Sequence, residues 1–379
     1  MSQTRTIPSR EAEASCRRAL QLKPDFVKAH SNLAIALREQ GRVADAEAGF
    51  KRALELDPAY AEAHVNYAFL LLQTGRFERG WQEYEYRWQA KNHEPLPAFG
   101  KPLWLGESDV RNKSILLWAE QGLGDSIQFV RYATLLAQRG ATVHLLVPPP
   151  LKALLASCTG VASVLVPGEP LPPFDYHCPL LSLPLACKTE LDTIPANIPY
   201  LAASAAAIAQ WRDRLGEPQA LRVGLVWAGS PRTNQPSAEA IDRQRSIGFN
   251  RLQALLDIEG IEFYSLQVGE PARSQLNGHP KVRDFTGQLH DFSDTAALIA
   301  NLDLVISVDT SVIHVAGALG KPVWLLNRYN TCWRWLSDRS DSPWYPSLRI
   351  FRQLTLGDWD GVIDDVRQAL LQRIRASDR

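Results

Sequence analysis

The sequence predicts helical repeats followed by two doubly wound α/β domains. Residues 1–92 are helical and periodic, with large and small apolar residues recurring at fixed spacing. Beyond them, short β-branched runs alternate with helical stretches in two successive sets. Strands that alternate with helices form parallel sheets, because each helix carries the chain back to the start of the next strand.

Charge and composition exclude several classes of protein. The chain has 379 residues, with 41 Lys and Arg against 41 Asp and Glu, so it has no basic footprint for nucleic acid or an anionic membrane. No apolar run is long enough for a membrane span, and the N-terminus is too polar for a signal peptide. The five cysteines are scattered and lack Cys-x-x-Cys spacing. These features predict a cytoplasmic protein with reduced thiols.

The N-terminal helices contain an internal repeat. Two similar segments end at Pro24 and Pro58, which lie 34 residues apart. The packing positions are Leu33, Ala34, Leu37, Gly41, Ala46, Phe50 and Ala53, and then Tyr67, Ala68, Leu71, Gly75 and Gly80. This pattern resembles the tetratricopeptide repeat, which has the same period. Because such arrays usually need three repeats, we expect the last helix to dock on the following domain through aromatic residues such as Trp81.

The first α/β domain is expected over residues 103–200. A proline-rich passage at 95–102 breaks the helical pattern before it. Apolar runs predict strands at 114–119, 143–147, 161–166 and 176–181, with helices at 126–139 and 151–157. Residues 183–201 are rich in proline without periodicity, which is typical of a linker.

The second α/β domain is expected over residues 205–379. Its strands are predicted at 222–227, 262–267, 282–284, 304–308, 323–326 and 348–351. Helices are predicted at 205–215, 249–256, 293–300 and 359–374. Two such sets joined by a linker predict two sheets that face each other across a cleft.

A Gly-x-Gly turn, formed by Gly122 and Gly124, follows the first strand. Glu120 and Gln121 precede the turn, and Asp125 opens the next helix. The turn lacks the third glycine of a dinucleotide fingerprint and the Gly-Lys-Ser/Thr of a Walker loop. Asp125 is therefore either a helix cap or a general base at the carboxyl end of the strand, with Glu120 as the reserve candidate.

Ser230 and Arg232 follow the first strand of the second domain, so they are expected at the carboxyl edge of its sheet. A flexible polar loop is expected over residues 234–245, and Arg243 and Arg245 lie near its end. Guanidinium groups beside a Gly-Ser turn suit a diphosphate, because they bind it with paired hydrogen bonds. A solvated loop is the alternative interpretation.

The most informative motif follows the strand at 304–308. Asp309, Thr310 and Ser311 open a short helix that carries His314 on its first turn. Backbone N–H groups at such a helix start suit a phosphate in the crevice of an α/β sheet. Capping of the helix by these polar side chains is the alternative.

Two later patterns have simpler interpretations. Aromatic and Arg residues interleave over 327–346, where they either stack on a base or sugar or form a packed corner. Asp358 and Asp360 form a D-x-D at the start of the last helix, where helix capping is the better explanation. The histidines outside the motif at 309–314 show no metal-ligand spacing.

These motifs resemble the two-domain GT-B glycosyltransferases. The match is to the heptosyltransferase-like group, glycosyltransferase family 9, in a form fused behind tetratricopeptide repeats. It rests on the segments 120–125 and 309–314 and on Ala-Leu-Gly-Lys-Pro at 318–322. The resemblance implies two facing Rossmann-like domains, the first on the acceptor side and the second binding the nucleotide sugar. A weaker, architectural resemblance is to the O-linked N-acetylglucosamine transferases, which also place such repeats before a GT-B half.

The resemblance also implies a metal-independent inverting glycosyltransferase whose donor is a nucleotide sugar, with no further cofactor. Asp125 matches the base in the family's first Gly-Asp motif. The loop that holds the donor diphosphate matches Asp309, Thr310, Ser311 and His314. We expect Asp125 and residues 310–314 to meet in the gap between the two domains.

The chain departs from the family pattern at two points. Ser311 stands where the family commonly has glycine, and the lysine of the family's donor loop is absent. Arg245 or Arg232 would replace that lysine, beside Ser230. On the acceptor side, the resemblance places Glu120, Gln121, Gly122 and Gly124.

The repeats suggest a protein or peptide acceptor. Asn32 and Asn66 occupy the same position in successive repeats, where amides either hold an extended peptide or serve packing. Two other functions stay open. One is a non-catalytic adaptor whose α/β half is inactive, and the other is a nucleotide-sugar epimerase, which shares the fold but needs no acceptor platform.

Overall fold

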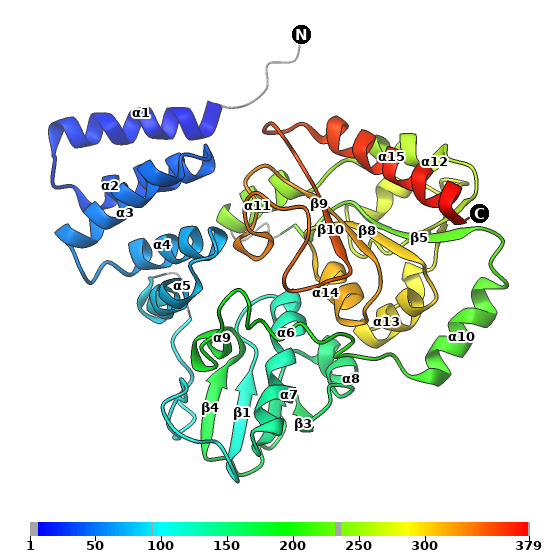
Figure 1. Ribbon diagram of the computed structural model, residues 1–379, viewed down its shortest axis with the longest axis horizontal. Helices are drawn as coiled ribbons and strands as arrows, with labels where there is room; N and C mark the ends of the chain where they lie inside the picture. The colour runs from blue at the N-terminus through cyan, green and yellow to red at the C-terminus, as the bar shows by residue number, and fades with distance from the viewer. Residues whose placement is uncertain (1–6, 92–93, 232–235, 378–379) are drawn as a thin grey trace. The chain divides into compact units, whose positions relative to one another are not determined.

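The computed structural model describes residues 7–91, 94–231 and 236–377, and it divides into two compact units. The first unit holds the chain up to Gly100 together with two short later segments, Pro184–Ile194 and Tyr329–Arg339. The second unit holds the rest of the chain and contains both parallel sheets (Figure 1).

The helices at the start of the first unit form successive hairpins. They are α1 (Ile7–Leu22), α2 (Val27–Glu39), α3 (Val43–Leu56), α4 (Ala61–Gln73) and α5 (Phe77–Tyr84), followed by the 3-10 turn η1 (Glu85–Gln89). Helix α2 packs on α3, and α4 packs on α5. The helical repeats that the 34-residue spacing predicts are therefore confirmed.

Glycines shape both hairpins. Gly41 and Gly75 turn the chain between the two helices of each hairpin with φ of +76° and +78°, a conformation that costs glycine little. Within the first hairpin, a Cβ on Gly49 would lie 2.9 Å from the Cβ of Ala34, so this glycine lets α3 cross α2 closely. The ring of Phe50 fills the space beside the crossing and is fully buried.

The two short later segments pack on the last repeat helices. On α5, Trp81 donates from Nε1 to Thr189 O at 3.0 Å, and its ring meets the Trp333 ring edge-on with centroids 5.3 Å apart. At the end of α4, Gln73 O accepts from Ser337 N at 3.1 Å. The aromatic surface expected at Trp81 therefore makes a packing contact, and its partners are residues of these two later segments.

Glu47 on α3 is held by three donors. Tyr67 Oη lies at 2.9 Å from its carboxylate, Arg76 Nη1 at 2.8 Å and Lys51 Nζ at 2.9 Å. Burial raises the pKa of Glu47, but these hydrogen bonds outweigh burial and lower it from 4.5 to about 2. A carboxyl whose pKa falls on folding stabilises the fold above its unfolded pKa, and that contribution is lost as the pH falls toward 2.

We therefore expect Glu47→Gln to lower the free energy of unfolding by about 1–2 kcal/mol at pH 7, a value reduced for solvent screening. Urea unfolding at pH 7, 5 and 4 measures the difference from the unchanged protein, which should shrink as the pH falls below 4.5. Glu55→Gln, which removes an exposed partner of Arg52, is the matched control. A deficit that stays constant across these pH values would contradict the assignment.

The first sheet of the second unit has four parallel strands in the order β3-β2-β1-β4. They are β1 (Ser114–Trp118), β2 (Thr142–Leu146), β3 (Val161–Leu165) and β4 (Tyr176–Pro179). The helices of this part are α6 (Leu123–Phe129), α7 (Arg131–Gln138), α8 (Lys152–Leu155) and α9 (Leu183–Ala186). The central strand β1 is fully buried over Ile115, Leu116 and Leu117, as its continuous apolar run predicts.

The second sheet has six parallel strands in the order β10-β9-β8-β5-β6-β7. They are β5 (Leu221–Val226), β6 (Ile261–Ser265), β7 (Val282–Asp284), β8 (Leu304–Val308), β9 (Val323–Asn327) and β10 (Leu348–Arg352). The helices are α10 (Ala205–Leu215), α11 (Pro236–Arg245), α12 (Gln253–Leu256), α13 (Phe292–Ala300), α14 (Ser311–Ala318) and α15 (Trp359–Ser377). Every strand expected from the sequence is present within two residues of its predicted range.

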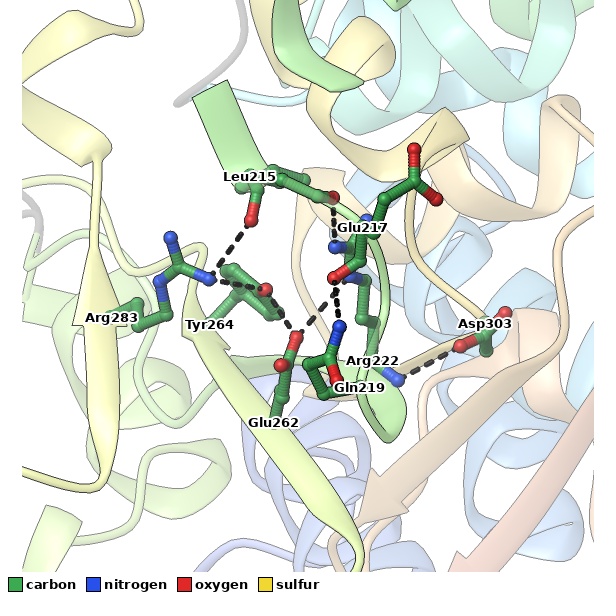
Figure 2. Close-up of polar contacts among 9 residues, drawn as sticks. Leu215, Glu217, Gln219, Arg222, Glu262, Tyr264, Arg283 and Asp303 are labelled. Carbon is green, nitrogen blue, oxygen red and sulfur yellow. Dashed lines mark hydrogen bonds and ion pairs between the residues drawn. The ribbon is translucent and has the colours of Figure 1, made fainter. Parts of the chain in front are cut away.

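Charged and polar side chains form a hydrogen-bonded network near the amino ends of the strands of the second sheet (Figure 2). Arg222 Nε and Tyr264 Oη both donate to Glu262 Oε2, at 3.3 and 2.7 Å. Arg283 Nη1 donates to Tyr264 Oη at 3.0 Å and to Leu215 O, at the end of α10, at 3.2 Å. This network ties α10 to β5, β6 and β7 at the edge away from the carboxyl ends of the strands.

Over the described ranges, no helix combines the length and the apolar character needed to cross a bilayer. Within those same ranges, no three His, Cys, Asp or Glu side chains are grouped to hold a metal ion.

Candidate functional site

Three polar turns lie where the strand order of the sheets reverses. In the first sheet, β2 and β4 flank β1 on opposite sides; in the second sheet, β6 and β8 flank β5 on opposite sides. Open α/β sheets bind ligands beside the carboxyl ends of strands at such reversals. The turn after β1 contains Gly122 and Asp125, the turn after β5 contains Gly229, and the turn after β8 contains Asp309 and Thr310.

Asp125 holds the start of α6. Its Oδ2 accepts a hydrogen bond from Gly122 N at 2.9 Å, in the first turn of the helix. Glu120, just before the turn, accepts from Leu181 N at 3.2 Å and so anchors the end of β1 to the segment after β4. Gln121 is exposed. The N-cap of α6 is Gly122, and Asp125 lies at the third helical position, from which it caps the helix start by bonding back to Gly122 N. Its role as a base stays a prediction.

The starts of α6 and α14 are in direct contact. A Cβ on Gly124 would lie 2.8 Å from His314 Cδ2 and 3.4 Å from Ser311 Cα. Any side chain at position 124 would displace the His314 ring, so this close approach explains the glycine. The structure therefore brings the turn of Asp125 next to the helix start at residues 310–314.

Arg245 connects the other two turns. Its Nη1 donates to Asp309 O at 2.7 Å, and its Nη2 lies 3.0 Å from Asp242 Oδ1. A Cβ on Gly229 would lie 2.1 Å from Asp242 Oδ1 and 2.2 Å from Arg245 Nη2. Gly229 N donates to Ser246 Oγ at 3.0 Å. The turn after β5, the end of α11 and the turn after β8 thus form one packed cluster.

The other predicted donor residues surround this cluster or lie elsewhere. Ser230 is exposed beside Gly229, and Thr310 precedes α14 with its Oγ1 3.2 Å from Ser307 Oγ. Arg243 instead pairs with Glu239 at 2.6 Å on the exposed side of α11, so it does not join Arg245. Arg232 lies outside the described residues.

The expected flexible loop over 234–245 is wrong for the part that the structure describes, because Pro236–Arg245 forms α11. Proline is well suited to the first position of a helix, since its missing N–H would have no helical partner there. Alanine and glutamate then favour the helix over the following turn. The high charge of this stretch hid its helical propensity.

His314 has a partner that the sequence did not reveal. Its Nδ1 lies 2.9 Å from Tyr345 Oη, and both side chains are buried. Tyr345 follows Trp344 in the aromatic stretch at 327–346, where Trp335, Trp344 and Tyr345 are fully buried. The packed-corner interpretation of that stretch is therefore confirmed for these residues. Only the aromatic composition of the stretch signalled its importance, and nothing in it indicated His314 as the partner.

Two remaining predictions concern helices. Asp358 Oδ1 accepts from Gly361 N at 2.9 Å, so the D-x-D caps α15 as expected. In the repeats, Asn32 on α2 is exposed, whereas Asn66 on α4 is partly buried and donates from Nδ2 to Glu62 O at 2.7 Å. The amide of Asn66 is thus engaged with its own helix.

Comparison with known families assigns two segments of the chain. Residues 37–80 match the tetratricopeptide repeat, and residues 273–353 match glycosyltransferase family 9 (heptosyltransferase). The chain thus contains a segment similar to the tetratricopeptide repeat and, later, a segment similar to glycosyltransferase family 9. The family 9 match spans β7 to β10 and so includes Asp309, His314 and Tyr345.

The chain is also similar to one relative over most of its length and to solved structures over its α/β part. Protein FlbA of Caulobacter vibrioides is 28% identical over 385 residues, which cover 93% of this chain and 62% of FlbA, so the chain spans about three fifths of that relative. The crystal structure of a glycosyltransferase family 9 protein from Veillonella parvula superimposes with a TM-score of 0.51 at 10% identity, over 70% of this chain and 97% of that one. The E. coli ADP-heptose lps heptosyltransferase II gives 0.46 at 14% identity, over 69% and 99%. The superposition on the Veillonella parvula protein and the two parallel sheets show that the α/β part has the GT-B fold.

Proposed function

We propose that this protein is an inverting glycosyltransferase that moves a sugar from a nucleotide-sugar donor without a divalent metal. The observation that carries the proposal is the contact of the Gly124 turn with the start of α14. Beside it, Arg245 bonds Asp309 O. These contacts link the turns that carry a carboxylate, a helix N-terminus and a guanidinium, and such groups suit sugar transfer from a diphosphate.

The proposed reaction proceeds in one displacement. Asp125 takes the proton of an acceptor hydroxyl while the hydroxyl oxygen attacks the anomeric carbon of the donor sugar. The bond from that carbon to the diphosphate oxygen breaks, and the nucleoside diphosphate leaves with the bonding electrons. Because attack comes from the face opposite the leaving group, the configuration at the anomeric carbon inverts.

The leaving diphosphate is stabilised by fixed positive partners. Backbone N–H groups at the start of α14 and the Arg245 guanidinium supply charge that a metal would otherwise provide. The hydroxyl groups of Ser230, Thr310 and Ser311 add donors at the same edge. Where the family commonly has a glycine, this chain has Ser311, which is less compact but adds a hydroxyl and keeps its backbone N–H.

The acceptor in this proposal is a protein or peptide held by the repeats. Tetratricopeptide repeats present extended surfaces that are suited to such partners. Asn32 is the exposed amide of the pair predicted to hold a peptide, whereas the Asn66 amide would first have to leave Glu62 O. A crosslinker placed at position 32 that captures the acceptor would support this part of the proposal.

A panel of radiolabelled nucleotide sugars, incubated with the full-length protein, tests the function. Hydrolysis of one donor, or label transferred to a component of a cell extract, is the expected result, and it should persist in EDTA. Inversion at C2 of the sugar without transfer would instead indicate an epimerase. No turnover of any donor, with or without extract, would indicate a non-catalytic adaptor and overturn the proposal.

Gly229→Ala is expected to weaken the binding of the matching nucleoside diphosphate roughly tenfold, because its Cβ would force Arg245 and Asp242 apart. Isothermal titration calorimetry measures this loss. Gly269→Ala is the control for glycine replacement in the loop after β6, because a Cβ there meets no atom within 4 Å, although its φ of +88° adds local strain. An unchanged affinity in Gly229→Ala would show that Arg245 is not part of the donor site.

A further inference from the structure

The two edges of the His314 ring have different surroundings. Nδ1 faces Tyr345 Oη at 2.9 Å, inside the protein. The opposite edge, Cδ2 and Nε2, faces the Gly124 turn, with Nε2 3.4 Å from the place that a Cβ on Gly124 would occupy. A neutral imidazole carries one proton, and the partner of one nitrogen decides which nitrogen holds it.

Tyr345 is fixed in place from several sides. Its ring lies flat on Gly317, one turn after His314, because a Cβ on Gly317 would come within 2.4 Å of Tyr345 Cδ1. The Arg131 guanidinium lies 4.7 Å from the centre of the same ring. Burial raises the pKa of Tyr345 well above its ordinary value, so its hydroxyl keeps its proton. Tyr345 is therefore a rigid hydroxyl group beside His314.

The neighbouring hydroxyl of Tyr200 has two other partners. It donates to Ile127 O at 2.9 Å, and its oxygen accepts from Arg131 Nη2 at 3.0 Å. Tyr345 Oη lies 3.3 Å from Tyr200 Oη but 2.9 Å from His314 Nδ1. The imidazole nitrogen is the nearer acceptor, and it is also the more basic one. Distance and basicity therefore favour donation from Tyr345 Oη to His314 Nδ1 over donation to Tyr200 Oη.

We propose that Tyr345 is a positioning residue that donates to His314 Nδ1 and so fixes the proton of the neutral ring on Nε2. That proton lies on the edge beside the Gly124 turn, where it donates to an oxygen of the donor diphosphate. The diphosphate part of this inference rests on the proposed function, whereas the position of the proton does not. In the opposite tautomer, Nε2 would present a lone pair and repel an anion.

Nitrogen-15 NMR of the unchanged protein tests the position of the proton directly. With labelled histidine, His314 is assigned by the signal that disappears in His314→Gln. The expected result at pH 8 is a protonated, pyrrole-type Nε2 and an unprotonated, pyridine-type Nδ1. A proton on Nδ1 would overturn the proposal, and this result depends on neither a substrate nor a substitution of Tyr345.

Tyr345→Phe tests the consequence, because it removes only the hydroxyl and keeps the ring on Gly317. We expect the His314 signals to shift or broaden as Nδ1 loses its partner, and pyrophosphate affinity at pH 8 to fall roughly tenfold by calorimetry. The matched control is Tyr264→Phe, which removes another buried hydroxyl, bonded to Glu262 and Arg283 at the amino end of the sheet (Figure 2). It should leave both readouts unchanged.

The outcomes separate this inference from the proposed function. Unchanged His314 signals and affinity in Tyr345→Phe, or an equal loss of affinity in Tyr264→Phe, would overturn the role of Tyr345. If the unchanged protein binds neither pyrophosphate nor any nucleoside diphosphate, the donor site itself fails, and with it the diphosphate contact. The NMR result then still decides whether Tyr345 sets the His314 proton.

Discussion

Asp125→Asn is expected to lower the rate of sugar transfer roughly 10²- to 10⁴-fold, the usual contribution of a general base. The amide oxygen of asparagine still accepts from Gly122 N, so the cap on α6 is kept. What is lost is the capacity to take a proton. Donor affinity should therefore stay within about twofold of the unchanged protein, since the loss concerns the transition state and not ground-state binding.

The measurement is a transfer assay with the donor identified from the panel, alongside calorimetry with its nucleoside diphosphate. Asp175→Asn is the matched control, because Asp175 also accepts from a backbone N–H, that of Ser114 at the other end of β1, at 2.9 Å. Transfer by Asp125→Asn at near the normal rate would show that Asp125 only caps its helix. Glu120 would then be the next residue to replace.

Replacement of Arg131 by methionine should cause the largest loss of stability. Arg131 is buried and donates to Gln128 O at 2.7 Å, Trp344 O at 2.7 Å, Pro195 O at 3.2 Å and Tyr200 Oη at 3.0 Å. Methionine fills part of the volume but donates nothing, so these oxygens lose a donor in an environment with little water. We expect the free energy of unfolding to fall by about 3–5 kcal/mol.

Thermal unfolding measures this effect, with an expected fall in Tm of about 6–15 °C for a unit of this size. Arg139→Met is the control on the same helix, since Arg139 is exposed at the end of α7. It should change Tm by no more than about 2 °C. A comparable Tm for the two variants would mean that the carbonyl groups around Arg131 find other donors.

The sequence allowed the strands and the polar turns at their ends to be predicted. A fully buried parallel strand needs a continuous apolar run, so β1, β5 and β8 stand out from their surroundings. The residue types at their carboxyl ends then identify the turns of Asp125, Gly229 and Asp309. In the second sheet the neighbouring positions of β5 and β8 bring the turns of Gly229 and Asp309 together, and the contact of Gly124 with His314 adds the turn of Asp125.

The features that the sequence did not reveal depend on distant partners. His314 and Tyr345 lie 31 positions apart, and Arg131 and Trp344 lie 213 positions apart, so no local pattern links them. Asp242 lies in the stretch that was predicted to be a flexible loop, and its ion pair with Arg245 requires the helix α11. Such contacts are set by packing between elements, which propensity and periodicity do not describe.

The contact between Trp81 and Trp333 limits where this protein can be truncated or its parts exchanged. Trp333 lies in the connection from β9 to β10, yet it packs with the repeat helices, as does the stretch around Thr189. A shortened polypeptide that starts at Lys101 would present that indole face to water and favour self-association. The repeats are consequently not an interchangeable adaptor. In evolution they have to be inherited with, and adjusted to, the loops of the half that follows.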